Sequence, residues 1–171
     1  MSKTAMNNTS ESNEFTLREA VESDIPRLSK HHSLMFEEIW EKTSRAIGEA
    51  KGAELENEYA EKLKQEMPAG VCKSWVFEKN NEIAASGAIS IVNLVSTPDD
   101  HSSRVAYLHT MYTEPQYRGN HLAGMIVQKA IGYCKSIGLK RIFLVASDAG
   151  KPVYEKIGFV SSPETMRYFI K

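Results

Sequence analysis

The chain has 171 residues, of which 42% are hydrophobic, and its formal net charge is −1. This length and apolar content suit one domain with a single core, and the small net charge, without a long basic run, argues against a nucleic-acid partner. The two cysteines, Cys72 and Cys134, lack the spacing of a metal site, so we expect reduced cysteines and no bound metal.

The N-terminal part predicts a tail and a first strand. Residues 1–13 are polar and rich in serine and asparagine, so we expect a disordered N-terminal tail, followed by one domain over residues 14–171. The first residues lack the apolar core of a signal peptide, and no later run is long enough to span a bilayer. The expected location is therefore cytoplasmic, without a membrane partner. Phe15 and Leu17 alternate with polar residues, as in a strand.

Two helices should follow that strand. Ser23 can cap the first one, and Pro26 is tolerated in its first turn. Residues 47–67 are rich in helix formers and predict a second helix that stops before Pro68.

The middle of the chain predicts a strand meander. Residues 74–78 and 83–92 read as an antiparallel pair joined by a tight turn at Lys-Asn-Asn-Glu. Gly87 marks a bulge or a close backbone approach within the second strand. Residues 104–112 form the next strand.

The C-terminal part predicts a helix, a buried strand and a short helix. The first helix starts near Asn120 and ends with Gly138 in the C′ position. Residues 141–147 are almost continuously apolar, as in a strand covered on both faces. A helix over 150–156 stops at Gly158, and residues 159–161 and 166–170 can form a hairpin-like pair. The expected fold class is mixed α/β (α+β), with a right-handed crossover around the helix from Asn120.

The segment MYTEPQYRGNHLA, residues 111–123, joins a strand to a helix through a basic turn. The first amides of a helix have no partner inside it and carry the positive end of its dipole, so they bind anions. Gly119 lets the backbone come close to a ligand, and Arg118 adds a permanent forked charge. The turn therefore predicts a phosphate site.

This turn resembles the acetyl-CoA signature of the GCN5-related N-acetyltransferases (GNAT family), written R/Q-x-x-G-x-G/A. The match runs over Arg118, Gly119, Asn120, His121, Leu122 and Ala123. His121 stands where the family usually has its first glycine, and a right-handed helical backbone there would leave its N–H free for a phosphate. RIFLVASDAGKPVYEKIGF (residues 141–159) and FTLREAVESDIPRL (residues 15–28) are similar to further family segments in the same order.

The resemblance implies the GNAT (acyl-CoA N-acyltransferase) fold, a mostly antiparallel sheet flanked by helices, with acetyl-CoA as acyl donor. It implies that main-chain groups of Met111, Tyr112 and Thr113 hold the pantetheine arm and that the six motif residues hold the pyrophosphate. Ser147 can also contact the cofactor, although Asp148 capping the next helix is the alternative for this turn. Tyr154 matches the family tyrosine that protonates the leaving thiolate. Alternatively, its ring only packs beside Phe159.

The base and the acceptor site remain open at this stage. Candidate bases are His109, Glu114, Glu37, Glu38 and Glu41. His31, His32, Phe36 and Trp40, with Glu37, Glu38, Glu41, Glu54, Glu56 and Glu58, gather on the two helices that wall the acceptor site in the family, which fits a cationic amine. The alternative is a solvated helical face with pairs such as Glu58 and Lys62.

We therefore expect an N-acetyltransferase that moves an acetyl group from acetyl-CoA to a primary amine of a small molecule or peptide by direct attack. Neither cysteine lies in a motif that suggests a covalent acyl-enzyme. Homodimers are common in the family, so a homodimer is compatible with this interpretation. One alternative is a non-catalytic acyl-CoA sensor or interaction protein on the same fold, and another is an enzyme that uses a longer acyl-CoA.

Overall fold

The computed structural model describes residues 14–42, 48–162, 166 and 168–170. The tail expected over residues 1–13 and the first residue of the helix expected over 47–67 lie outside the described residues. The elements are β1 (Thr16–Glu19), η1 (Glu22–Asp24), α1 (Ile25–Glu41), α2 (Glu49–Glu66), β2 (Cys72–Lys79), β3 (Glu82–Asn93), β4 (Arg104–Thr113), η2 (Pro115–Tyr117), α3 (Leu122–Ser136), β5 (Ile142–Leu144) and α4 (Lys151–Ile157).

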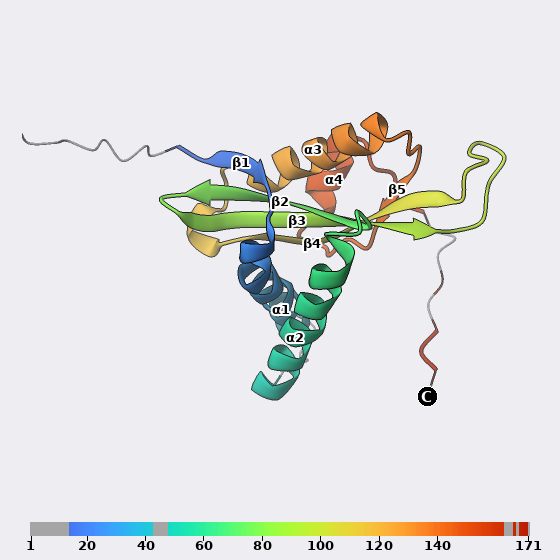
Figure 1. The fold of residues 1–171 in the computed structure, drawn as a ribbon. Coiled ribbons are helices and arrows are strands. Elements are labelled where there is room, and N and C mark those ends of the chain that lie inside the picture. The colour runs from blue at the N-terminus through green and yellow to red at the C-terminus, as the bar shows by residue number, and fades with distance from the viewer. Residues whose placement is uncertain (1–13, 43–47, 163–165, 167, 171) are drawn as a thin grey trace, which may run out of the picture.

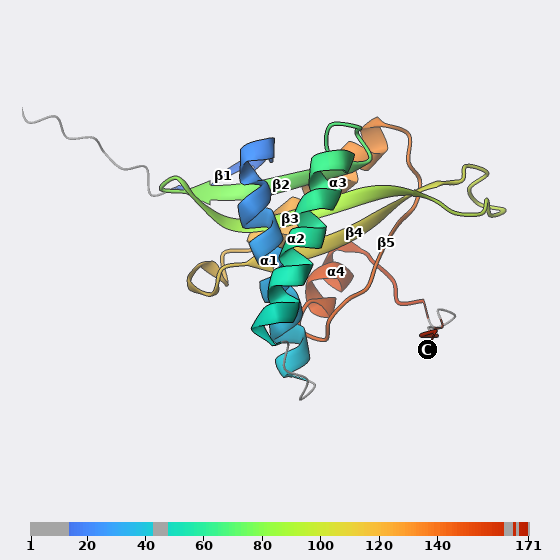
Figure 2. The same cartoon turned by 60° about the horizontal axis from the view of Figure 1, so that its bottom comes forward.

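The described strands form one sheet in the order β1-β2-β3-β4-β5. Strands β1 to β4 pair antiparallel, whereas β5 runs parallel to β4. Helices α1 and α2 cover one face of the sheet, and α3 and α4 lie on the other face (Figures 1 and 2). The expected mixed α/β class, with a mostly antiparallel sheet flanked by helices, is confirmed. None of the described helices combines the length and apolarity that a membrane span requires.

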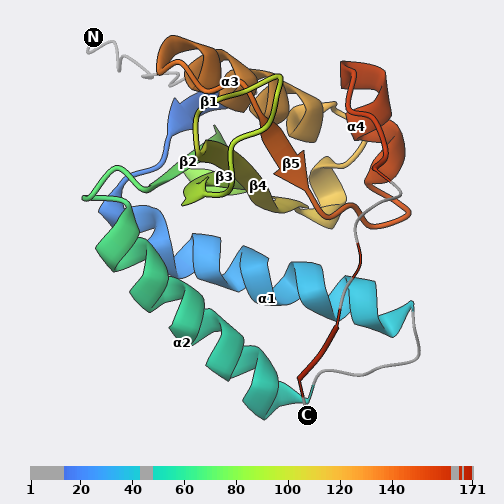
Figure 3. The same ribbon diagram turned by 90° about the vertical axis from the view of Figure 1, so that its right-hand side faces the viewer.

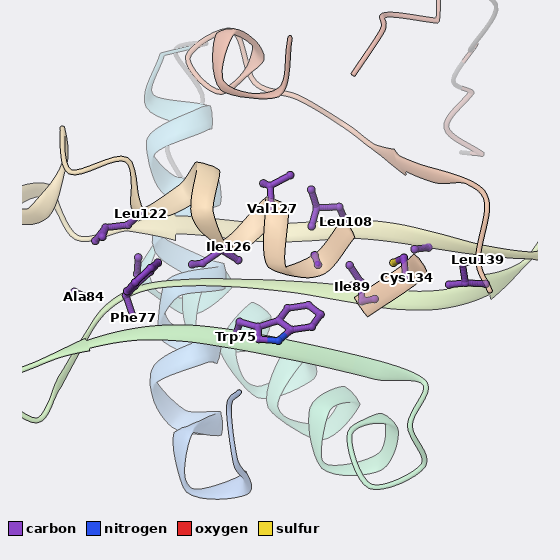
Figure 4. Close-up of a cluster of buried hydrophobic side chains, with 13 residues drawn as sticks. Trp75, Phe77, Ala84, Ile89, Leu108, Leu122, Ile126, Val127, Cys134 and Leu139 are labelled. Atoms are coloured by element: carbon purple, nitrogen blue, oxygen red, sulfur yellow. The ribbon is translucent and has the colours of Figure 1, made fainter. Parts of the chain in front are cut away.

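Each face of the sheet has its own core. Trp75 and Phe77 pack with Ile126 of α3 on one face (Figure 4), and Val76, which lies between them in β2, packs with Leu28 of α1 on the other. This alternation follows from the two-residue period of a strand, which sends successive side chains to opposite faces. The sheet is thus anchored to both helical layers.

The turns and helix ends confirm several local predictions. Asn80 (φ 51°) and Asn81 (φ 62°) both have positive φ, as the tight turn between β2 and β3 requires. Gly138 (φ 76°) and Gly158 (φ 109°) follow α3 and α4 in the left-handed conformation that ends a helix. Pro26 lies in the first turn of α1.

A bulge lies in the middle of β4, opposite Gly87. The register with β3 shifts between Ser86 and Ala88, and Thr110 adopts a left-handed backbone with φ 53°. A Cβ on Gly87 would lie 2.2 Å from Met111 Sδ and 2.8 Å from Ile126 Cγ2, so a side chain here would require these groups to shift. The predicted bulge is confirmed at the register of Gly87, but the extra residue lies in β4, and the atoms that approach Gly87 belong to side chains rather than to the backbone. Because a bulge bends its strand, the second half of β4 runs in a different direction from the first half.

The start of α1 differs from the prediction. Ser23 does not cap it: Ser23 lies inside η1, and the N-cap position is held by Asp24. The Asp24 carboxylate accepts the Val21 N–H at 2.8 Å and pairs with Arg18 at 2.7 Å, which ties the helix start to β1. The preceding 3-10 turn, which residue propensities do not signal, moves the helix start by one residue.

The C-terminal strands differ from the prediction more than the start of α1 does. Strand β5 has only three residues and is an edge strand, and Phe143 is 39% exposed, so the prediction of a strand covered on both faces is wrong. The hairpin-like pair expected over 159–161 and 166–170 is wrong as well, because the described residues of these segments contain no strand. Met166 and Ile170 are more than 90% exposed. Apolar composition alone could not distinguish an edge or an uncovered segment from an interior strand.

Candidate active site

The parallel strands β4 and β5 separate halfway along β4. They pair only between Ala106–Leu108 and Ile142–Leu144, and β4 continues to Thr113 without a described strand beside this edge. The main-chain groups of Met111, Tyr112 and Thr113 therefore belong to the part of β4 that β5 does not cover. Ligands of open sheets bind where parallel strands end and diverge, so the edge is suited to an extended ligand arm.

A cavity of about 770 Å³ lies at this opening. Its walls come from α1, α2, β3, the central part of β4, the start of α3, the segment after β5, and α4. Figure 3 shows α1 and α2 running beneath the sheet, with α4 beyond β5 on the other side. The cavity therefore lies between the helical pair and the α4 layer, where two ligands can meet.

The N-terminus of α3 offers uncapped amides. The first intrahelical bond runs from the Met125 N–H to the His121 carbonyl at 3.2 Å, so the preceding amides of Leu122, Ala123 and Gly124 have no helical partner. No side chain caps them. Gly119 turns the chain toward them with φ 85°. This arrangement has the donors and the dipole that an anion site needs.

His121 departs from the expected conformation. Its backbone is left-handed (φ 60°, ψ 15°), not right-handed. The chain must reverse direction here before α3 begins, and this is the position at which the family usually has glycine. Histidine is among the residue types that tolerate this region, at a cost of roughly 1–2 kcal/mol. The next residue, Leu122, is 2% exposed and begins the buried face of α3.

Arg118 points toward α1. Its Nη2 lies 2.5 Å from Glu38 Oε1, and its Nε donates to the Thr113 carbonyl at 3.0 Å. The guanidinium also lies over the Tyr112 ring. Asn120 donates to the Tyr117 carbonyl at 2.9 Å. The motif side chains thus shape the turn, while the uncapped amides supply its free donors.

Tyr154 lies in α4 and lines the cavity. Burial raises the pKa of its phenol to about 12, so the phenol stays protonated at neutral pH. The ring also meets Phe159 edge-on, with 5.8 Å between ring centroids. The Tyr154 side chain can therefore pack beside Phe159 and face the cavity at the same time.

Ser147 also lines the cavity and begins the turn into α4. Its hydroxyl accepts the Gly150 N–H at 3.2 Å, and its carbonyl accepts the Lys151 N–H at 2.9 Å. Ser147 therefore supports the start of α4, and the alternative that Asp148 caps this helix is wrong. The turn brings Ser147 rather than Asp148 next to the first helical amides.

Glu114 lies outside the cavity, and its carboxylate is occupied by contacts with Arg27 and His31. Its Oε1 accepts from Arg27 Nη2 at 2.5 Å and lies 3.0 Å from His31 Nε2, while His31 Nδ1 lies 2.8 Å from Ser86 Oγ. Burial lowers the pKa of His31 to about 3, so the imidazole is neutral. This group of four links α1 to β3 and to the residue that follows β4. Glu114 and the fully buried His31 serve as structural links, and neither lines the cavity.

Two other histidines meet inside the cavity. His32 Nδ1 lies 2.9 Å from Thr110 Oγ1, and His109 Nδ1 lies 3.1 Å from the same oxygen. His109 Nε2 lies 3.0 Å from Ser90 Oγ. Burial lowers the pKa of His32 to about 4 and that of His109 to about 3, so both rings are neutral at pH 7. Sequence reasoning missed Thr110, because only the bulge brings its hydroxyl between the two rings.

The acidic residues of the two helices do not gather in the cavity. Glu58 is the one carboxylate among its described lining residues. Glu56 binds Lys30 and Ser33, at 2.8 and 2.7 Å, and Glu38 binds Arg118. The remaining acidic candidates are exposed and do not line the cavity: Glu37, Glu41 and Glu54. The predicted acidic wall is therefore wrong, whereas the exposed carboxylates agree with the alternative of a solvated helical face, in which Lys62 pairs with Glu66 rather than with Glu58.

The described residues contain no group of three His, Cys, Asp or Glu side chains that could hold a metal ion. What the site offers is an uncovered strand edge, an anion site and a cavity with neutral acid and base groups. These are the parts that acyl transfer from a thioester uses.

Comparison with known proteins agrees with this geometry. The structure is similar to a predicted acetyltransferase from Clostridium acetobutylicum solved with acetyl-CoA, with 26% identity, a TM-score of 0.81, and coverage of 91% of this chain and 96% of that chain. It shares its fold with a GCN5-related N-acetyltransferase from Ralstonia eutropha (17% identity, TM-score 0.80, 91% and 99% coverage). Glucosamine-6-phosphate N-acetyltransferase from Arabidopsis thaliana also shares the fold (19% identity, TM-score 0.65, 92% and 99% coverage).

No curated protein sequence matches the chain significantly. The model of the acetyltransferase (GNAT) family, however, matches residues 27–159, which is most of the chain. The family and the relative solved with acetyl-CoA support acetyl transfer as the general reaction. The chain belongs to the acetyltransferase (GNAT) family.

Proposed function

We propose that the protein is an N-acetyltransferase that moves the acetyl group of acetyl-CoA to a primary amine of a small molecule or peptide. The observation that carries this proposal is the opening between β4 and β5, which joins an uncovered strand edge to the uncapped amides of α3. A pantetheine arm needs such an edge, and a pyrophosphate needs such amides. The relative solved with acetyl-CoA supports the choice of donor.

The binding roles follow the two parts of the opening. Main-chain groups of Met111, Tyr112 and Thr113 hold the arm and polarise the thioester carbonyl. The turn over residues 118–123 holds the pyrophosphate, and Ser147 borders the arm. Acetyl-CoA supplies the activated acyl group.

The proton transfers use the neutral groups in the cavity. The acceptor nitrogen forms the C–N bond to the acetyl carbon while the C–S bond breaks, and the thiolate takes the phenol proton of Tyr154. His32 is the base that this arrangement favours, because only its Nδ1 hydrogen-bonds to a described side chain, whereas hydroxyl groups contact both ring nitrogens of His109. The pKa of His32 is lowered, so it takes the proton after C–N bond formation has made the amine nitrogen acidic, and solvent returns a proton to the Tyr154 phenolate. Both rings contact Thr110, which supports a role of Thr110 and His109 in orienting the His32 ring.

Direct attack is supported by the position of the cysteines. Cys72 and Cys134 are each 1% exposed, and neither lines the cavity. Burial raises the pKa of both thiols to about 11, so little thiolate is present at neutral pH. A covalent acyl-enzyme on cysteine would need the opposite properties.

The test is a thiol-release assay with acetyl-CoA and a panel of primary amines. Acceptor-dependent release of coenzyme A is the expected result. Tight acetyl-CoA binding, measured by calorimetry, without any acceptor-dependent thiol would contradict the proposal and favour a non-catalytic acyl-CoA sensor. Competition between acetyl-CoA and longer acyl-CoAs in the same assay tests the choice of acyl chain.

A further inference from the structure

We infer that the acceptor is a small primary amine with one apolar or aromatic body, of the arylalkylamine type. The inference rests on the proposed acetyl transfer and names the class of its acceptor. It depends on which side chains of α1 and α2 face the cavity.

The α1 wall of the cavity is aromatic and aliphatic. His32, Phe36 and Trp40 follow one another at intervals of four residues, and Met35 and Ile39 lie on the same side. His32 and Phe36 meet edge-on at 5.1 Å, and Phe36 and Trp40 meet at 6.2 Å. Apart from the imidazole that contacts Thr110, this wall offers apolar surface and aromatic rings.

The α2 wall continues this surface. Leu55 and Tyr59 line the cavity one turn apart, and the Tyr59 ring stacks on His32 with 4.1 Å between centroids. Glu58 is the one carboxylate in this wall, and Lys62 is paired with Glu66. The wall therefore presents a single negative charge, which suits an acceptor with one ammonium group.

These walls discriminate between classes of amine. A polyamine or an amino sugar would place several ammonium or hydroxyl groups against Phe36, Trp40 and Leu55, and each polar group buried without a partner lowers affinity by roughly tenfold. A phenyl or indole body leaves no polar group unpaired against these side chains and gains apolar contact area. One amine on an apolar body therefore fits this cavity best.

The length of the α1 wall sets the size of the body. His32 lies at the reacting end, where it contacts Thr110 beside the bulge. Trp40 lies eight residues further along α1, which corresponds to about 12 Å at 1.5 Å per residue. A single ring on a short alkyl chain can be enclosed over this distance.

The first experiment compares acceptors with the wild-type protein and acetyl-CoA. We expect kcat/KM for 2-phenylethylamine or tryptamine to be at least tenfold higher than for spermidine, glucosamine 6-phosphate or a lysine peptide. An equal or higher value for any of these polar acceptors would overturn the inference.

A second experiment measures binding without turnover, so that the two proposals can fail separately. Trp40 lines the cavity, whereas Trp75 lies in the core, so a change in tryptophan fluorescence on titration reports the cavity. We expect 2-phenylethylamine, but not spermidine, to change the emission. If 2-phenylethylamine changes the emission but no thiol is released in the assay, acetyl transfer is refuted and the cavity's preference is supported. If 2-phenylethylamine does not change the emission, the preference itself is refuted.

A matched pair of variants tests the wall directly. Leu55→Asn replaces an apolar lining side chain of α2 by an amide, and we expect kcat/KM for 2-phenylethylamine to fall about tenfold. Ala53→Asn places the same amide on an exposed position of α2 outside the cavity and serves as the control. Equal effects of the two variants, with both folded by circular dichroism, would contradict the inference.

Discussion

Glu38 competes with the ligand for Arg118 if this arginine binds the pyrophosphate as proposed. The carboxylate lies 2.5 Å from the guanidinium, and the two side chains are 38% and 47% exposed. Ion pairs this exposed contribute about 0–1 kcal/mol. Because binding must break the pair, Glu38→Gln should lower the dissociation constant of acetyl-CoA by up to about fivefold, since 1.4 kcal/mol corresponds to tenfold.

Isothermal titration calorimetry at low and high salt measures this effect. Glu37→Gln is the matched control, because this substitution removes the same charge from an exposed neighbour of Glu38 that does not contact Arg118. The gain from Glu38→Gln should shrink in high salt, where exposed pairs are screened, and should vanish in an Arg118→Gln background. Weaker binding by Glu38→Gln, or an effect no larger than that of Glu37→Gln, would refute the reasoning.

Four further predictions concern catalysis and stability. Tyr154→Phe should lower kcat by about 100-fold or more with little change in acetyl-CoA affinity, because it removes the proton donor but keeps the ring; unchanged turnover in the thiol assay would reject this role. The pKa of buried His31 is lowered from 6.5 to about 3, so the unfolded chain binds more protons and stability should fall as pH drops from about 6.5 toward 3. Urea unfolding at pH 7 and pH 5 measures this loss, and equal free energies would contradict it. His121→Gly should change the unfolding free energy by less than about 1 kcal/mol, since relief of the left-handed backbone offsets the flexibility of glycine, whereas His121→Val should be clearly destabilising. Gly87→Ala should destabilise by roughly 1–3 kcal/mol, because its methyl group would overlap Met111; a wild-type urea midpoint would show that this space can relax.

Local features of the fold could be predicted because the residues that cause them are adjacent in the chain. The two asparagines after β2 tolerate positive φ and form the turn, and Gly138 and Gly158 end their helices for the same reason. The glycine-containing turn before α3 was likewise enough to predict uncapped amides. The left-handed conformation of His121 could not be predicted, because residues with a Cβ adopt this region uncommonly and the local sequence does not signal the exception.

The polar groups of the site could not be assigned in the same way. Glu114 lies 87 residues from Arg27, and Arg118 lies 80 residues from Glu38, so only the packing of α1 on the sheet brings these charges together. The same packing turns most acidic side chains of α1 and α2 away from the cavity and leaves Phe36 and Trp40 in it.

The sequence by itself determined most of the helices and strands, their order, the glycine-containing turn before α3 and the family resemblance, because these depend on propensities and motifs within a few residues. The tertiary structure alone decided which strand became an edge, where β4 and β5 separate, and which charged groups neutralise one another. These properties depend on distances between segments far apart in the chain, and no local pattern encodes such distances.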